Sequence, residues 1–210
     1  MTDPEIISYL KEKYGIGIQE YIPFPKPYVE DIDHVKAIYL GCDPSNVSND
    51  KFEFAFALEG TNPRYNQFIS SHQKNLNTID LKWNNLYVQN LCLNYFQKET
   101  SKNLKLWKQT VREFWTYQLY NELSIFPITI PVLLTAQCLL EVLAFGGYEK
   151  IPAIDFYECR SPIPVPADKN LLGRPLIPFY RGLNPRIKKS YNLSSGNWIT
   201  YQQQIRELFE

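Results

Sequence analysis

The sequence predicts an α/β protein, a three-layer α/β/α sandwich around a central four-stranded parallel sheet. Short, mostly apolar runs alternate along the chain with segments of helical character. Strands that alternate with helices in this way form a parallel sheet with helices on both faces. The four runs expected to form the strands are Val35–Leu40, Leu86–Asn90, Ile130–Thr135 and Pro175–Tyr180.

The helices follow from apolar spacing and from the residues at their ends. In Leu104–Leu123, the strongest pattern, apolar residues recur at helical spacing. Residues 62–80 are polar and are expected to hold a short helix plus a loop, and residues 151–173, with four prolines, are expected to be loop. The other expected helices run from Thr2 or Asp3 to about Tyr14, from Ala136 to Ala144 and from Trp198 to Phe209.

The length of 210 residues fits one domain, 1–210. Residues 1–34 are expected to form a helix followed by a proline-rich arm, YIPFPKPYVE, that lies extended on the core. The formal net charge of zero argues against a protein held to nucleic acid by bulk charge alone. The four cysteines lie far apart without a CxxC pair, so we expect no zinc site and no iron–sulfur cluster built on local spacing. The sequence implies no metal and no cofactor.

The first residues, MTDPEIISYL, do not have the basic and then apolar pattern of a secretory signal. No apolar run approaches the ~20 residues that span a bilayer. We therefore expect an intracellular, cytoplasmic protein without membrane association.

The most informative segment is VKAIYLGCDPSN, residues 35–46, in which an apolar run stops at Gly41 and Asp43 follows, fixed by Pro44. Ligands of open α/β sheets bind outside the carboxyl ends of the strands. Other chemistry-bearing residues also fall at or shortly after predicted strand ends, and we expect them to share one pocket. They are Phe54, Phe56, Asn90 and the segment Gly182-Leu183-Asn184-Pro185-Arg186.

This ordered set resembles the uracil-DNA glycosylase superfamily from about Val35 to the end of the chain. GCDP matches that family's Gly-x-Asp-Pro motif after a strand. Phe56 in FAFAL stands where an aromatic ring stacks on the extruded base, and YVQN ends at Asn90, where an Asn reads the base edge. Asn184-Pro185 stands where the family usually carries His-Pro in its final loop.

The resemblance implies a monofunctional DNA glycosylase that hydrolyses the N-glycosidic bond of an extruded uracil or another damaged or modified base. It implies a monomer that acts on single- or double-stranded DNA, associated with the nucleoid if the source is prokaryotic. The implied residues are Asp43 and Asn184 for catalysis; Gly41, Cys42, Ser45, Phe56 and Asn90 for substrate binding; and Pro44, Pro185, Arg186, Lys188 and Lys189 for DNA contact.

Two departures from the family leave open which base is preferred and whether the protein is active. Neither histidine, His34 or His72, stands in the final loop, and the loss of one such donor typically costs ~100-fold to 1,000-fold in rate. Ser45 replaces a bulky aromatic that shields the pocket in uracil-specific members, so a larger base could enter. The alternative is a catalytically weak or inactive glycosylase-like protein that binds nucleic acid.

Each site residue also has a purely structural interpretation. Asp43 could cap a turn, Phe56 could belong to the core with Phe54 as an equal candidate for stacking, and Asn90 could satisfy turn backbone. Asn184-Pro185 could be an ordinary turn, and the basic residues beside it could form a solvated face. Cys42 is expected to be a packed small residue, and His72 to lack a partner. An unrelated doubly wound enzyme is the last alternative, because no glycine-rich phosphate loop is present.

Overall fold

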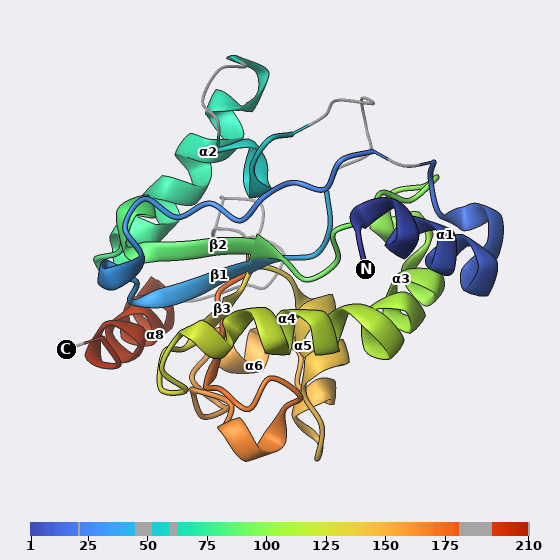
Figure 1. Cartoon of the computed structure of the whole chain (residues 1–210). Coiled ribbons are helices and arrows are strands. Elements are labelled where there is room, and N and C mark those ends of the chain that lie inside the picture. The colour runs from blue at the N-terminus through green and yellow to red at the C-terminus, as the bar shows by residue number, and fades with distance from the viewer. Residues whose placement is uncertain (21, 45–51, 59–62, 181–194, 210) are drawn as a thin grey trace.

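A computed structural model describes residues 1–20, 22–44, 52–58, 63–180 and 195–209. Its centre is a four-stranded sheet in the order β2-β1-β3-β4, with every neighbouring pair parallel (Figure 1). The predicted α/β class with a four-stranded parallel sheet is therefore confirmed. The strands are β1 (Ala37–Gly41), β2 (Leu86–Asn90), β3 (Val132–Leu134) and β4 (Leu176–Pro178).

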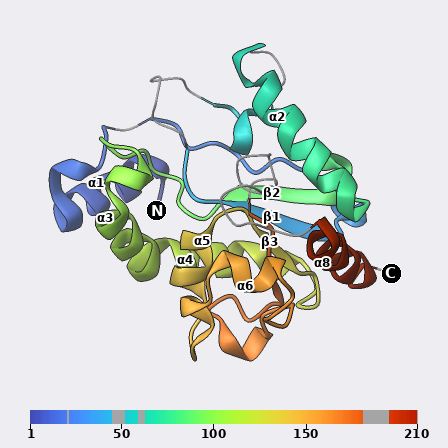
Figure 2. The same ribbon diagram turned by 180° about the vertical axis from the view of Figure 1, so that it is seen from behind.

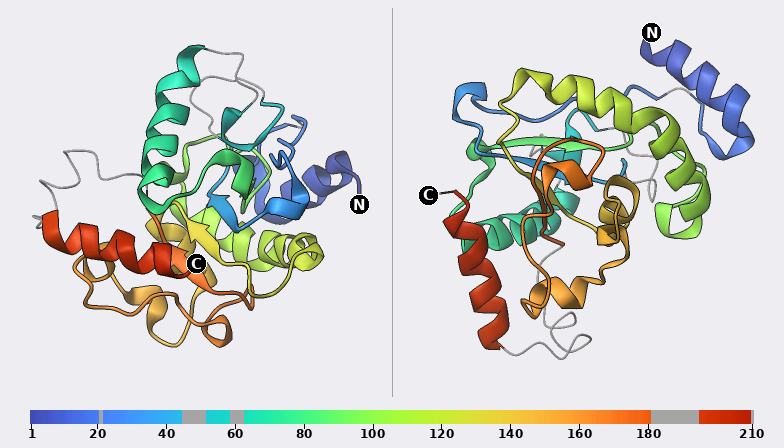
Figure 3. Two further views of the ribbon diagram at one scale, coloured as in Figure 1. Left: turned by 90° about the vertical axis from the view of Figure 1, so that its left-hand side faces the viewer. Right: turned by 90° about the horizontal axis from the view of Figure 1, so that it is seen from below.

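All residues of the four strands are buried, because helices cover both faces of the sheet. Tyr39 of β1 points toward His72 of helix α2 (Pro63–Leu76), and Tyr87 of β2 points to the other face, where it donates a hydrogen bond to Glu122 of helix α4 (Thr116–Glu122). The view along the sheet shows α2 and the C-terminal helix α8 (Ser195–Glu207) on one side and α4 on the other (Figure 3, left). These layers match the predicted sandwich.

Two segments differ from the sequence-based expectation. The stretch 62–80 is dominated by one long helix, α2, because its buried and half-buried residues recur every four positions at Phe68, His72 and Leu76. The proline-rich stretch 151–173 contains a helix, α6 (Ala153–Tyr157), that packs against α8. Figure 2, which shows the molecule from behind, has α6 in view. The remaining helices are α1 (Asp3–Tyr14), α3 (Leu104–Thr110), α5 (Gln137–Leu143), α6 (Ala153–Tyr157) and α8 (Ser195–Glu207).

The predicted helix over Leu104–Leu123 is one helical stretch with a wider turn in its middle. Helices α3 and α4 are joined by a π-helical segment, Val111–Trp115, and the Thr116 hydroxyl donates to the carbonyl of Val111 at 3.0 Å. The turn directs the indole N–H of Trp115 to Asn94, at 2.7 Å, in the segment that follows β2. The long helix is thereby fixed to the carboxyl end of the sheet.

The proline-rich arm lies extended along the edge of the sheet. Tyr28 exchanges two backbone hydrogen bonds of 2.9 Å with Val88 of β2 and so covers the outer edge of that strand. The arm also exchanges backbone bonds with the segment after β1: the Lys26 N–H donates to Glu53 at 2.8 Å, and the Ala55 N–H donates to Lys26 at 2.9 Å. The arm therefore holds the segment that carries Phe54 and Phe56 in place.

None of the helices in the described ranges combines the length and apolar character that a bilayer crossing requires.

Candidate functional site

The carboxyl ends of β1 and β2 lie side by side and bring two predicted site residues together. Gly41 and Asn90 are aligned in the parallel register, each as the last residue of its strand. Beyond the strands the two chains stay paired, because the N–H groups of Leu91 and Cys92 donate to the carbonyls of Gly41 and Cys42 at 2.8 and 2.9 Å. The Asp43 segment therefore leaves the sheet along a fixed path beside Asn90.

The position of Gly41 leaves no room for a side chain, because two other groups occupy that space. A Cβ atom at this position would lie 2.3 Å from Asn90 Oδ1 and 2.7 Å from the Phe56 ring, both far below van der Waals contact. The absence of a side chain lets the Asn90 amide and the Phe56 ring approach the end of β1. Gly41 thus shapes this end of the sheet.

Phe56 is held in an unfavourable backbone conformation. Its φ is 60° and its ψ is 16°, and Ala57 follows with φ 56°, so two consecutive non-glycine residues adopt the left-handed region. Such residues cost about 1–3 kcal/mol each and persist where the surroundings determine them. The Phe56 ring packs against Tyr39 (centroids 5.2 Å), His72 (5.4 Å) and Phe68 (6.1 Å, nearly parallel). Side chains of β1 and of α2 therefore support this ring from behind.

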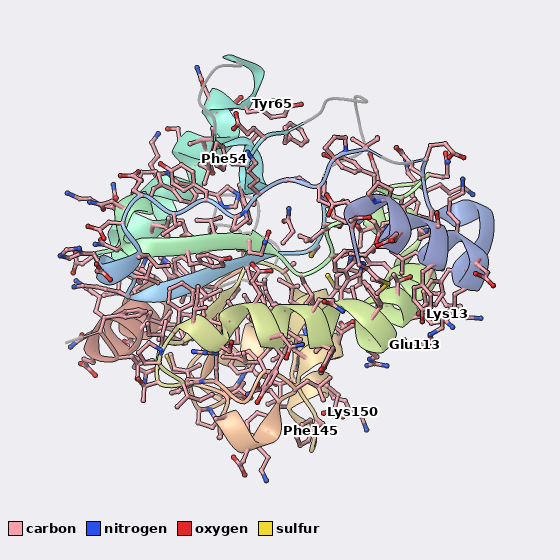
Figure 4. The ribbon with its side chains drawn as sticks, viewed as in Figure 1. Lys13, Phe54, Tyr65, Glu113, Phe145 and Lys150 are labelled. Carbon is pink, nitrogen blue, oxygen red and sulfur yellow. The ribbon has the colours of Figure 1, made fainter. Side chains whose placement is uncertain are left out.

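A cavity of about 320 Å³ opens at this end of the sheet. It brings together the predicted residues Gly41, Cys42, Asp43, Phe56 and Asn90, and also Pro44, which the sequence assigned to DNA contact. Phe54 and Tyr65, from the segment before Phe56 and from α2, lie on the same side of the molecule in Figure 4. The other lining residues are Pro25, Phe52, Phe54, Ala57, Tyr65 and Phe68.

Asp43 is half-buried at the rim of this cavity, and its carboxylate accepts a hydrogen bond from the Thr100 hydroxyl. Thr100 begins a short 3-10 helix, Thr100–Lys102, ten residues after β2 ends. Burial, followed by the nearby charge of Asp43, raises the pKa of Cys92 well above its usual value. A carboxylate held in this way can orient a water molecule or stabilise a cation that forms in the cavity.

Asn90 is only 5% exposed, and its backbone N–H donates to Gln89 Oε1 at 2.8 Å. Its side-chain amide makes no hydrogen bond to any residue that the structure describes. The Asn90 amide lines the cavity with one donor group and one acceptor group, a pattern suited to the edge of a polar heterocycle.

The expectation that His72 lacks a partner is wrong. His72 is buried, and its Nδ1 lies 2.6 Å from the Tyr39 hydroxyl. Its ring also packs against Phe68, with centroids 4.4 Å apart. His72 is thus part of the support behind Phe56 and not a solvated residue of a polar loop.

Sequence reasoning identified Phe54 and Phe56 but missed Thr100 and the other aromatic residues of the cavity lining, Phe52, Tyr65 and Phe68. The alternation Phe52, Phe54, Phe56 and the helical spacing of Tyr65 and Phe68 were visible signals. Thr100 offered no signal, because only the path of the chain after β2 brings it to Asp43. The predicted residues Ser45, Asn184, Pro185, Arg186, Lys188 and Lys189 lie outside the described residues.

Within the described ranges, no group of three or more His, Cys, Asp or Glu side chains is placed to hold a metal ion. Comparisons with protein-family models, with curated proteins and with solved structures found no match to this chain.

Proposed function

We propose that this protein is a DNA glycosylase that hydrolyses the N-glycosidic bond of an extruded uracil or another damaged or modified base. The observation that carries the proposal is the convergence of Asp43, Phe56 and Asn90 on one cavity at the carboxyl ends of β1 and β2. These residues are far apart in sequence, and each supplies a different part of the chemistry that base excision needs. The cavity volume of about 320 Å³ falls at the lower end of the range for small-ligand pockets and suits a single base.

In this proposal the base leaves the stack and enters the cavity, where its ring lies against Phe56. Stacking on an aromatic side chain contributes about 1–3 kcal/mol per base. The strained backbone and the rings of Tyr39 and Phe68 keep the Phe56 ring from yielding when a base enters. The Asn90 amide then hydrogen-bonds to the polar edge of the base as donor and acceptor.

Asp43 acts on the sugar. As the C–N bond breaks, the sugar develops oxocarbenium character, and the carboxylate stabilises this cation and orients the attacking water. The Thr100 hydroxyl fixes the carboxylate by donating to one of its oxygens. Because the bond is hydrolysed by water, no cofactor is required.

The remainder of the proposal rests on the sequence. Asn184 would donate to a carbonyl oxygen of the departing base, and Pro185 would enter the duplex with its loop. Arg186, Lys188 and Lys189 would contact phosphates. An amide cannot carry charge as a histidine can, so this loop stabilises the leaving base less than the family's usual residue would.

A base-release assay tests the proposal. Labelled single- and double-stranded DNA carrying uracil, hypoxanthine, xanthine or modified cytosines and thymines is incubated with the protein, and abasic sites are cleaved with alkali. We expect release from at least one substrate and its loss in Asp43→Asn, which keeps an oxygen for Thr100 to donate to. The matched control, Asp168→Asn at a position 71% exposed, should release base at the wild-type rate.

Full activity in Asp43→Asn would contradict the assignment of the catalytic carboxylate. No release from any substrate, together with binding that weakens steeply with salt, would instead support the non-catalytic nucleic-acid-binding alternative. If the protein neither releases a base nor binds nucleic acid, both functions are rejected.

A further inference from the structure

Two cysteines from different parts of the fold meet at the edge of the cavity. Cys42 follows β1 directly, and Cys138 lies in the first turn of α5. Their sulfur atoms are 3.3 Å apart, and both residues are half-buried and reduced. The two positions are separated by 96 residues in sequence, so only the fold brings the thiols together.

From this geometry we propose that Cys42 and Cys138 form a reversible disulfide on reaction with a hydroperoxide, so that the chain carries a redox-modification site beside the cavity. An S–S bond measures about 2.05 Å, so the sulfurs need to approach by only a little more than about 1 Å. Such a movement lies within the reach of two side-chain rotations. The inference is independent of the glycosylase proposal, because it concerns only the two thiols.

The electrostatics of the pair favour Cys138 as the residue that reacts first. A hydrogen bond from the Cys42 thiol lowers the pKa of Cys138, which outweighs the opposing effects of burial and of Glu141 and Asp43. The thiolate is the reactive form of cysteine. By contrast, burial raises the pKa of both Cys92 and Cys159, so these two thiols should react more slowly than Cys138 and serve as internal references.

The reaction proceeds in two balanced steps. The Cys138 sulfur attacks one oxygen of hydrogen peroxide, an S–O bond forms, the O–O bond breaks, and water leaves after taking up a proton. The Cys42 sulfur then attacks the sulfur of this sulfenic acid. The S–S bond forms, the S–O bond breaks, and a second water leaves with the Cys42 proton. The two thiols together lose two electrons, and the peroxide gains them.

The bond would tie the residue before Asp43 to the first turn of α5. The backbone of this segment is already held on its other side by the hydrogen bond from the Cys92 N–H to the Cys42 carbonyl. Oxidation therefore fixes the segment that carries Asp43 from both sides. A reductant reverses the bond, since thiol–disulfide exchange needs only access of a thiolate to one sulfur.

Peptide mapping tests the site directly, because tryptic cleavage places each cysteine in a separate peptide. Residues 37–51 carry Cys42 and residues 113–150 carry Cys138, while Cys92 lies in 83–98 and Cys159 in 151–160. The folded protein is treated with hydrogen peroxide, its free thiols are alkylated, and the digest is analysed by mass spectrometry. We expect a linked pair of the first two peptides that has lost two hydrogen atoms and that dithiothreitol separates.

Three variants sharpen the test. Cys42→Ser and Cys138→Ser should each abolish the linked pair, and Cys159→Ser should leave it unchanged. In Cys42→Ser, Cys138 should accumulate as sulfenic or sulfinic acid, since its resolving partner is gone. Far-ultraviolet circular dichroism shows that each variant is folded before treatment. Unlinked thiols at both positions in the oxidised wild type, or a disulfide that uses Cys92 or Cys159 instead, would overturn the proposal.

Discussion

The Tyr39 hydroxyl lies 2.6 Å from Nδ1 of His72, and this buried hydrogen bond connects the central strand β1 to helix α2 directly behind the Phe56 ring. Tyr39 is fully buried, and His72 is 5% exposed. Both rings contact Phe56, so the polar pair also fixes the apolar surface against which Phe56 rests. A polar contact deep in the fold thus determines the position of a ring that lines the cavity.

We expect Tyr39→Phe to lower the free energy of unfolding by about 1–3 kcal/mol, because it keeps the ring but removes the hydroxyl that His72 meets. Urea denaturation measures the change. The control is Tyr117→Phe at a position 67% exposed, which should stay within about 0.5 kcal/mol of the wild type. Equal free energies of unfolding for both variants would show that the hydrogen bond between the Tyr39 hydroxyl and His72 does not stabilise the fold.

The strands were predictable because each is an apolar run short enough to be a strand and too short to be a buried helix. Helix α2 was not predictable at its full length, since its face toward the sheet includes His72, which a hydrophobicity pattern counts as polar. The partner that makes burial of His72 acceptable is Tyr39, and nothing in the sequence pairs these two residues. The missed helix therefore reflects a tertiary contact that overrides local polarity.

The same distinction applies to the candidate site. Asp43 and Asn90 could be identified because they stand at the carboxyl ends of strands, where parallel sheets bind their ligands. Thr100 could not, because its place in the site depends on the path that the chain takes after β2. Asp43, Phe56 and Asn90 meet in one cavity, as the sequence analysis expected.

Gly41→Ala should disable the site more than it destabilises the fold. The new methyl group would displace both Asn90 Oδ1 and the Phe56 ring, which lie 2.3 and 2.7 Å from its position. Because a displacement of about 1 Å can cost about 100-fold in rate, we expect a loss of base release of that size. The assay above measures it.

The control for Gly41→Ala is Gly15→Ala, at the end of α1. Gly15 has a φ of 77°, a ψ of −156° and open space around its Cβ position, so this variant should lose about 1–3 kcal/mol through backbone strain alone. It should keep wild-type base release. If Gly41→Ala also releases base at the wild-type rate, then Asn90 and Phe56 do not act from the positions described.

Stability should fall at high pH in part through Tyr28. Burial and, to a smaller degree, the hydrogen bond to Glu30 raise the pKa of Tyr28 to about 12, whereas an unperturbed tyrosine has a pKa of about 10. The folded state thus holds the phenolic proton more tightly than the unfolded state. This contribution is fully present below about pH 10 and is lost as the pH rises toward about 12.

The measurement compares urea midpoints of the wild type and Tyr28→Phe at about pH 8 and about pH 11. The stability advantage of the wild type should shrink at the higher pH. Glu30→Gln removes the charged group to which the Tyr28 hydroxyl donates its hydrogen bond. This variant should therefore also lose less stability as the pH rises. An advantage of the same size at both pH values would mean that Tyr28 does not contribute to the alkaline loss.

Asn90→Ala should separate activity from stability. The Asn90 amide lines the cavity and makes no hydrogen bond to the described residues, so its removal should leave the free energy of unfolding nearly unchanged. Base release should fall about tenfold to a hundredfold, because two hydrogen bonds to the base, each worth about 0.5–1.5 kcal/mol, are lost.

The opposite behaviour is expected of Asn170→Ala, since the Asn170 amide donates to the carbonyls of Pro166 and Arg174 at 2.8 Å, away from the cavity. That variant should unfold at lower urea concentration and keep its rate. A loss of stability in Asn90→Ala with full base release would assign Asn90 to the fold and not to the recognition of a base.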